Sequence, residues 1–109
     1  MADKFLSFLG LCRKAGKMSI GHDAALESIM KERAKLCVLM TDASDRLKAE
    51  FAKAASYNGR QLEVIHTSHT MAQLKAETGI RAGVITIDDD GFAKKTAELH
   101  RANHEEDSL

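Results

Sequence analysis

At the centre of the chain stands Lys35-Leu36-Cys37-Val38-Leu39-Met40-Thr41-Asp42, in which five apolar residues follow one another between polar neighbours. A run of this length suits a strand, and the lack of apolar and polar alternation is typical of a strand that is covered on both faces. We therefore expect a central strand over 36–40 that pairs in parallel and lies between two layers of helices.

Two helices are expected before this strand. Asp3 is a suitable N-cap, and apolar side chains follow it at positions 5, 8, 9 and 12, which is the period of an amphipathic helix over 4–14. Gly16 is expected to end this helix, and the segment 17–20 is short enough for a turn or a brief strand. Apolar residues at positions 25, 26, 29 and 30 then predict a second helix over about 22–32.

Another helix and strand are expected after the central strand. Asp42 can serve as the N-cap of a third helix, whose apolar stripe lies at positions 47, 51, 54 and 55. Tyr57-Asn58-Gly59 is a typical helix terminator. The segment 62–66, Leu-Glu-Val-Ile-His, is expected to be the next strand.

The last third of the chain repeats this alternation. Thr70 and Gln73 form a capping box for a short fourth helix that Gly79 ends, and 84–87 is a further strand. A final helix is expected after the acidic run 88–90, with Phe92 and Leu99 on its inner side.

This order of elements predicts an α/β protein with one core. We expect a single domain over 1–101, folded as a three-layer α/β/α sandwich around a small mixed or largely parallel sheet, followed by a frayed polar acidic tail over 102–109. Cys12 and Cys37 fall within apolar patterns, so both are expected to be buried thiols rather than half-cystines.

The composition argues against several classes of protein. The chain is 44% hydrophobic and 29% charged, and no apolar run reaches the roughly 18 to 20 residues that span a bilayer. The N-terminus lacks the pattern of a signal peptide, so we expect a cytoplasmic protein that does not contact membranes. His22, His66 and His69 lack the spacing of metal ligands, and we see no nucleophile–base pair or cofactor loop. We therefore expect no metal, no cofactor and no enzymatic activity.

Charge is unevenly distributed although the formal net charge is zero. The first twenty residues carry four cations and one acid, whereas the last twenty-two carry seven acids and three cations. Arg13, Lys14 and Lys17 stand with Gly16 and Gly21 where two expected helices meet, and this combination of cations and accessible amides suits a phosphodiester backbone. Alternatively, the cations only complement the dipole at the C-terminus of the first helix.

Four segments together carry a family resemblance: Leu9 to Gly21, Gly21-His22-Asp23-Ala24-Ala25-Leu26, Ala34 to Ser44, and Asp90-Gly91-Phe92-Ala93. In this order and spacing they resemble the ribosomal L-seven-Ae/L-thirty-e family, and most of all its bacterial YlxQ-type branch. The resemblance covers roughly residues 4–97. It implies a three-layer, non-catalytic domain that binds structured RNA, such as a kink-turn or an internal loop.

The resemblance also implies which residues contact RNA. In the family a glycine at the start of the second helix approaches the RNA backbone and polar residues follow it, positions that Gly21, His22 and Asp23 occupy here. This chain departs from the pattern at Ala24 and Glu27, where the family has a glutamate and a lysine. Gly21 and Asp23 would also be suitable as ordinary helix-start residues.

A second contact implied by the family is an apolar loop before the last strand, which we assign to the loop 67–72, with Met71 packing on a base or sugar. Further cations near the second helix would add affinity. The expected partner is ribosomal RNA or the ribosome rather than DNA, bound by a monomer. The full set of expected RNA contacts is Arg13, Lys14, Lys17, Gly21, His22, Asp23, Lys31, Arg33, Lys35, Ser68, His69 and Met71.

The acidic ends of the expected strands allow an alternative function. Asp42 and Asp88-Asp89-Asp90 follow strands, and carboxylates at the carboxyl ends of parallel strands can hold a divalent cation or receive a phosphoryl group. The chain could then be a small phosphoacceptor or protein-interaction domain, although a receiver-like domain needs five strands. Asp89 or Asp90 could instead cap the last helix.

Overall fold

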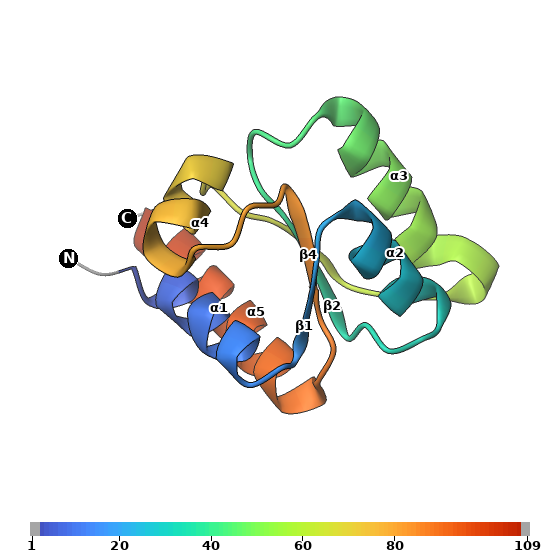
Figure 1. Ribbon diagram of the computed structural model, residues 1–109, viewed down its shortest axis with the longest axis horizontal. Coiled ribbons are helices and arrows are strands. Elements are labelled where there is room, and N and C mark those ends of the chain that lie inside the picture. Colours follow the sequence, from blue (N-terminus) through green and yellow to red (C-terminus); the bar gives the residue numbers. More distant parts are fainter. Residues whose placement is uncertain (1–2, 108–109) are drawn as a thin grey trace.

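The computed structural model describes residues 3–107, with the side chains of residues 3–103. The chain folds into three layers, a sheet between two layers of helices (Figure 1). The elements in chain order are α1 (Lys4–Lys14), β1 (Met18–Ile20), α2 (His22–Met30), β2 (Leu36–Leu39), α3 (Asp45–Ser56), the 3-10 helix η1 (Tyr57–Gly59), β3 (Val64–His66), α4 (Met71–Thr78), β4 (Val84–Ile87) and α5 (Asp90–Asp107). Helices α1, α4 and α5 cover one face of the sheet, and α2 and α3 cover the other. The three-layer sandwich expected from the sequence is confirmed.

The sheet is mixed, with strand order β1-β4-β2-β3. β2 pairs in parallel with β3, placing Cys37 beside Val64, whereas β4 runs antiparallel to both β1 and β2. All four residues of β2 are buried, as expected for a strand covered on both faces. The expectation of parallel pairing for this central strand is correct only on its β3 side.

Each face of the sheet has its own apolar core. Phe5, Leu9 and Ile85 are fully buried on the side of α1, and on the side of α2 and α3 Phe51 is fully and Ile29 almost fully buried. Cys12 and Cys37 belong to these cores as free thiols, which confirms their expected burial. Burial raises the pKa of the Cys37 thiol to about 12, so this thiol stays protonated at neutral pH.

Local capping explains where most helices begin and end. The Asp3 carboxylate accepts a hydrogen bond from the Leu6 N–H, and Thr70 and Gln73 form the expected capping box. Gly79 ends α4 in the left-handed conformation, with a φ of 79°. Each of these three signals was visible in the sequence because it depends only on residues within one helical turn.

The expected N-cap of α3 is wrong. Ser44, not Asp42, caps the helix by accepting a hydrogen bond from the Leu47 N–H. The chain first makes a turn in which the Ala43 N–H donates to the Met40 carbonyl, so α3 begins only at Asp45. Asp42 instead accepts a hydrogen bond from the Met71 N–H, a contact between segments that are far apart in the sequence.

The last helix begins as expected and continues further. Asp89 caps α5 by accepting a hydrogen bond from the Phe92 N–H, and the Phe92 ring packs against that of Phe8. The helix continues to Asp107, so the domain boundary expected after residue 101 and the expected fraying from Ala102 fall within α5. None of the helices within residues 3–107 is both long and apolar enough to cross a membrane.

Candidate functional site

The end of α1, the strand β1 and the start of α2 form a continuous segment, residues 13–23, which we call the helix joint. Arg13 and Lys14 are exposed in the last turn of α1, and Lys17 is exposed just after Gly16, whose φ is 72°. The Lys17 carbonyl accepts a hydrogen bond from the Asp88 N–H, which holds this turn against the end of β4. The structure therefore gathers the three cations at one end of the joint.

Gly21 lies at the other end of the joint, one short strand from Lys17, or about 13 Å at the rise of a strand. It precedes α2 with φ 91° and ψ 171°, and among the described residues no atom beyond those of its chain neighbours lies within 4 Å of the position that a Cβ would take. The first hydrogen bond within α2 runs from the Ala25 N–H to the Gly21 carbonyl, so the preceding amides of the helix have no partner within it. This open backbone carries the positive end of the helix dipole.

Replacing Gly21 with alanine is expected to destabilise the fold by about 1–3 kcal/mol, because the backbone conformation at this position suits only glycine. Gly10→Ala is the matched control, since the added methyl group would make ordinary contact with Thr78 and the helix would gain propensity. Urea denaturation of both variants measures the difference. Equal stability of the two variants would show that Gly21 carries no strain.

His22 starts α2 between two carboxylates. Its Nδ1 lies 2.8 Å from an Asp23 oxygen and its Nε2 lies 2.9 Å from the Glu50 carboxylate of α3. These hydrogen bonds, first that of Asp23 and then that of Glu50, raise the pKa of the imidazole above its ordinary value of 6.5. The sequence suggested a polar contact here but could not show the pairing with Glu50.

We expect the imidazole of His22 to titrate above pH 6.5, and its pKa to fall in both Asp23→Asn and Glu50→Gln, because each variant removes a negative charge that favours the protonated ring. Nuclear magnetic resonance titration of the ring protons measures this pKa. Glu63→Gln, a change on another part of the surface, serves as the control. An unchanged pKa in both variants would contradict the assignment.

The loop over 79–83 joins the helix joint from a distant part of the sequence. Arg13 Nη1 donates a hydrogen bond to the Thr78 carbonyl at 2.9 Å, which places the end of α1 beside this loop and its exposed Arg81. At the other end of the loop, the residue after Gly83 accepts the hydrogen bond from the Gly21 N–H. The loop thus lies along the whole joint, and no local motif in the sequence indicates that Arg81 belongs to it.

The loop 79–83 is distinct from the predicted apolar contact loop 67–72, whose role in binding stays a prediction. The segment directly before the last strand, β4, is 79–83, whereas 67–72 connects β3 to α4. Met71 nevertheless lies close to the joint, because its sulfur would be 3.3 Å from a Cβ on Gly83. The signal that could have found the loop is its place immediately before Val84 in the sequence.

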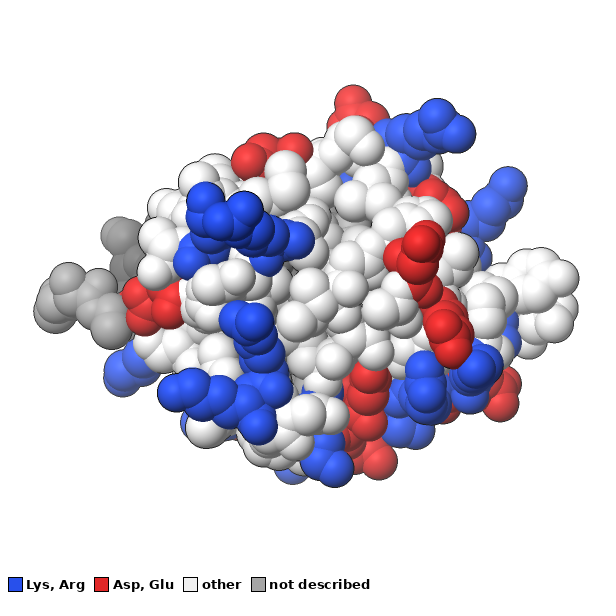
Figure 2. All heavy atoms as spheres, viewed as in Figure 1, with Lys and Arg blue, Asp and Glu red and all other residues white. Residues whose placement is uncertain are grey.

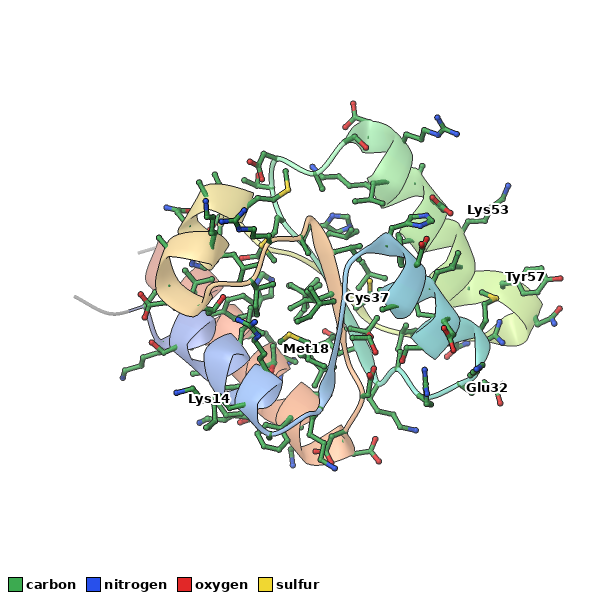
Figure 3. All side chains as sticks on the ribbon, viewed as in Figure 1. Lys14, Met18, Glu32, Cys37, Lys53 and Tyr57 are labelled. Atoms are coloured by element: carbon green, nitrogen blue, oxygen red, sulfur yellow. The ribbon has the colours of Figure 1, made fainter. Side chains whose placement is uncertain are left out.

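Charge is unevenly distributed on the face that carries the joint, although exposed Glu77 of α4 lies among the cations of α1 and α4. In Figure 2, Lys and Arg side chains gather over α1 and α4, whereas Asp and Glu lie over α2. Figure 3 labels Lys14 near the end of α1 and Lys53 on the far side of the molecule on α3. The exposed cations of α1, of α4 and of the turns that follow them are Lys4, Arg13, Lys14, Lys17, Lys75 and Arg81.

The other expected contacts do not meet at the joint. Lys31 and Arg33 follow the opposite end of α2, where Lys31 lies 2.7 Å from the Glu27 carboxylate. Lys35 precedes β2 and is separated from the joint by β4. Ser68 and His69 follow β3 at the other edge of the sheet. A sequence analysis based on spacing could not separate these positions from Gly21, because the sheet order is a tertiary property.

The two acidic strand ends lie far apart. Leu39 pairs with Val84 and Leu36 pairs with Ile87, so Asp42 and Asp88 follow opposite ends of antiparallel strands. A phosphoacceptor site needs both at one edge. Within residues 3–103 no group of three or more His, Cys, Asp or Glu side chains is arranged to hold a metal ion.

Asp88 has a structural role instead. Its carboxylate accepts hydrogen bonds from the hydroxyl groups of Ser19, Ser28 and Thr86, which come from β1, α2 and β4. Ser28 and Thr86 are fully buried. One carboxylate thus holds three elements beneath the joint.

Asp88→Ala is expected to destabilise the protein by about 2–3 kcal/mol, because buried hydroxyl groups lose their acceptor. Asp90→Ala, which removes an exposed carboxylate two residues later, is expected to cost less than about 1 kcal/mol through the helix dipole alone. Thermal unfolding of both variants provides the comparison. Similar losses in the two variants would contradict the role given to Asp88.

The chain is similar in sequence to a protein of known name and in fold to solved structures. The chain is 31% identical over 96 residues to the RNA-binding protein YlxQ of Enterococcus faecium, covering 88% of this chain and 90% of that protein. A protein of unknown function from Bacillus halodurans superposes with a TM-score of 0.83 at 25% identity, covering 92% of this chain and 99% of the other. The 15.5 kD RNA-binding protein of Giardia lamblia superposes with a TM-score of 0.66 at 17% identity, over 89% and 82% of the two chains, and shows likeness of fold. No family model matches the chain.

Proposed function

The chain belongs to the family of the RNA-binding protein YlxQ, and from this we propose that it is a non-catalytic protein that binds structured RNA through its helix joint. The observation that carries the proposal is the gathering of Arg13, Lys14 and Lys17 near Arg81 at one end of a joint whose other end is the open backbone of Gly21. Phosphate contacts by such cations supply affinity without sequence preference.

The two ends of the joint have different roles in this proposal. The cations at the end of α1 and on the loop 79–83 contact phosphates, whereas the start of α2 offers backbone amides and the polar side chains of His22 and Asp23 to bases or sugars. The carboxylates of Asp23 and Glu27 make the α2 side unsuitable for phosphates. A bent RNA, which turns its backbone toward one side and its bases toward the other, fits this division.

We infer a kink-turn or a related internal loop as the ligand, in ribosomal RNA or the ribosome, bound in the cytoplasm by a monomer. Membership in the YlxQ family and the positions of Gly21, His22 and Asp23 support this choice. Met71 would support the contact by packing beneath Gly83. No cofactor is needed, because binding rests on charge and shape.

Fluorescence anisotropy with a kink-turn RNA and a plain duplex of equal length tests the proposal. We expect tighter binding to the kink-turn at every salt concentration, and a linear fall of log affinity with log salt. Equal affinity for both RNAs would show that the protein contacts phosphates without preferring the kink-turn. Failure to bind either RNA at low salt would refute it.

A further inference from the structure

A cavity lies where the carboxyl ends of β2 and β3 meet, away from the helix joint. After β2 the chain leads into α3 on one face of the sheet, and after the parallel neighbour β3 it leads into α4 on the other face. Two parallel strands whose following helices lie on opposite faces leave a crevice between their connecting loops. Such a topological switch point is where open α/β sheets most often bind ligands.

The structure has a cavity of about 240 Å³ at this point, which we call the strand-end pocket. Its polar lining includes Thr41 at the end of β2, Lys48 of α3, His66 and Ser68 at the end of β3, and Asn103 of α5. Among the side chains of residues 3–103 no Asp or Glu lines it, whereas the cavity beside Arg13 and Lys14 includes Glu77. At roughly 30 Å³ per water molecule, the pocket can hold a small polar group together with some of its hydration water.

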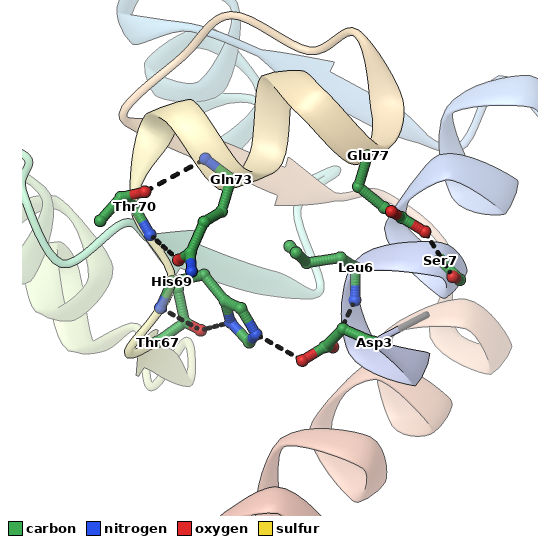
Figure 4. Close-up of polar contacts among 8 residues, drawn as sticks. All are labelled: Asp3, Leu6, Ser7, Thr67, His69, Thr70, Gln73 and Glu77. Carbon is green, nitrogen blue, oxygen red and sulfur yellow. Dashed lines mark hydrogen bonds and ion pairs between the residues drawn. The ribbon is translucent and has the colours of Figure 1, made fainter. Parts of the chain in front are cut away.

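The pocket has one wall that is held rigidly. His69 lies between Thr67 Oγ1 and the Asp3 carboxylate, 2.8 Å from its Nε2, as Figure 4 shows. Its ring stacks on Phe5 with the ring centres 5.3 Å apart. The His69 carbonyl accepts a hydrogen bond from the Thr41 N–H, so the two loops that form the crevice are joined.

Other groups in the pocket remain available to a ligand. The Lys48 ammonium donates one hydrogen bond to the Thr41 carbonyl, which holds it at the pocket and leaves two of its N–H groups. Within the described part of the chain, the side chains of His66, Ser68 and Asn103 make no hydrogen bond or ion pair. The nearby Asp3 and Asp42 carboxylates accept hydrogen bonds from His69 and from the Met71 N–H, outside the lining.

We propose that the strand-end pocket binds a phosphate group through Lys48, His66 and Ser68. A cation and polar donors that converge, with no carboxylate among the described side chains of the lining, suit the oxygens of a phosphate. The phosphate can belong to a free small anion such as a nucleotide or to the end of an RNA. The proposal is independent of the helix joint, because the pocket lies at the opposite edge of the sheet from β1.

Titration of the isotope-labelled full-length protein with inorganic phosphate at constant ionic strength tests the proposal. We expect saturable shifts of the Thr41 and Ser68 amides and of the His66 ring protons. Lys48→Ala and His66→Gln are each expected to weaken the affinity about fivefold to tenfold, the loss of one charge-assisted or polar contact. Lys53→Ala, on the same helix but outside the pocket, should leave it unchanged.

Further titrations distinguish the source of the phosphate. A nucleoside 5′-monophosphate that binds more tightly than inorganic phosphate, and loses this affinity in Lys48→Ala, identifies a nucleotide. A short RNA is compared with and without a 5′-phosphate. If the 5′-phosphate form binds more tightly to the unaltered protein but not to Lys48→Ala, the phosphate belongs to an RNA end. Absence of saturable shifts at the pocket, or equal affinity in Lys48→Ala and the unaltered protein, overturns the proposal whether or not the helix joint binds RNA.

Discussion

Simultaneous replacement of Arg13, Lys14 and Lys17 by alanine is expected to weaken binding to a kink-turn RNA about 100-fold at near-physiological salt. The three side chains are exposed, so each phosphate contact is screened and contributes about 1 kcal/mol, and 1.4 kcal/mol corresponds to a tenfold change. The salt dependence should also become flatter, because each lost contact with a phosphate lowers the slope of log affinity against log salt by about 0.7–0.9. Anisotropy titrations at several salt concentrations measure both quantities.

The matched control removes the same charge from another part of the surface. Lys31, Arg33 and Lys53 are exposed at the far corner of α2 and α3, and their triple alanine variant is expected to lose less than about fivefold in affinity. Equal losses in the two triple variants would show that net charge, and not the helix joint, determines binding. Unchanged binding of the first variant would contradict the proposed interface.

Phe51→Ala is expected to produce the largest loss of stability, about 3–5 kcal/mol, because it empties the centre of the core beneath α2 and α3. The ring is fully buried, and its edge meets the His22 ring with 5.7 Å between ring centres. The loss of packing should therefore also loosen the start of α2, where His22 lies. We expect the variant to bind RNA more weakly even at temperatures where it remains folded. Urea denaturation with anisotropy on the same sample measures both effects.

Leu11→Ala is the control for apolar truncation, because Leu11 is half exposed on α1 and no cavity opens around it in the core. Its expected cost is below about 1 kcal/mol. If Phe51→Ala cost no more than Leu11→Ala, the face of α2 and α3 would not be a packed core. If it were unstable yet kept full RNA affinity below its unfolding transition, the link between this core and the joint would be wrong.

The helices and strands could be predicted from the sequence because their signals are local. The apolar period from Phe5 to Cys12, the N-cap at Asp3 and the capping box at Thr70 depend on residues within a few positions of one another. The buried run over 36–40 showed that the central strand is covered on both sides, and so predicted the three layers. The exception, the N-cap at Asp42, arose because a distant amide, that of Met71, competed for its carboxylate.

The candidate site was only partly visible in the sequence. Arg13, Lys14, Lys17 and Gly21 are near one another in the chain, and a short strand keeps them so in space. Arg81 joins them only because α1 packs on α4, which no local pattern reveals. Lys31 and Arg33 were expected to lie with these cations for the same reason. They follow the nine-residue helix α2 and so lie at its opposite end.

The sequence by itself determined the elements, the burial of β2 and the basic segment between the first two helices, since all three follow from short-range periodicity and charge. The tertiary structure alone decided that β4 runs antiparallel between β1 and β2. That direction separates Asp42 from Asp88 and brings the loop 79–83 to Gly21. Strand order and direction depend on which apolar faces pack together, and this choice is made by contacts between residues that are distant in the sequence.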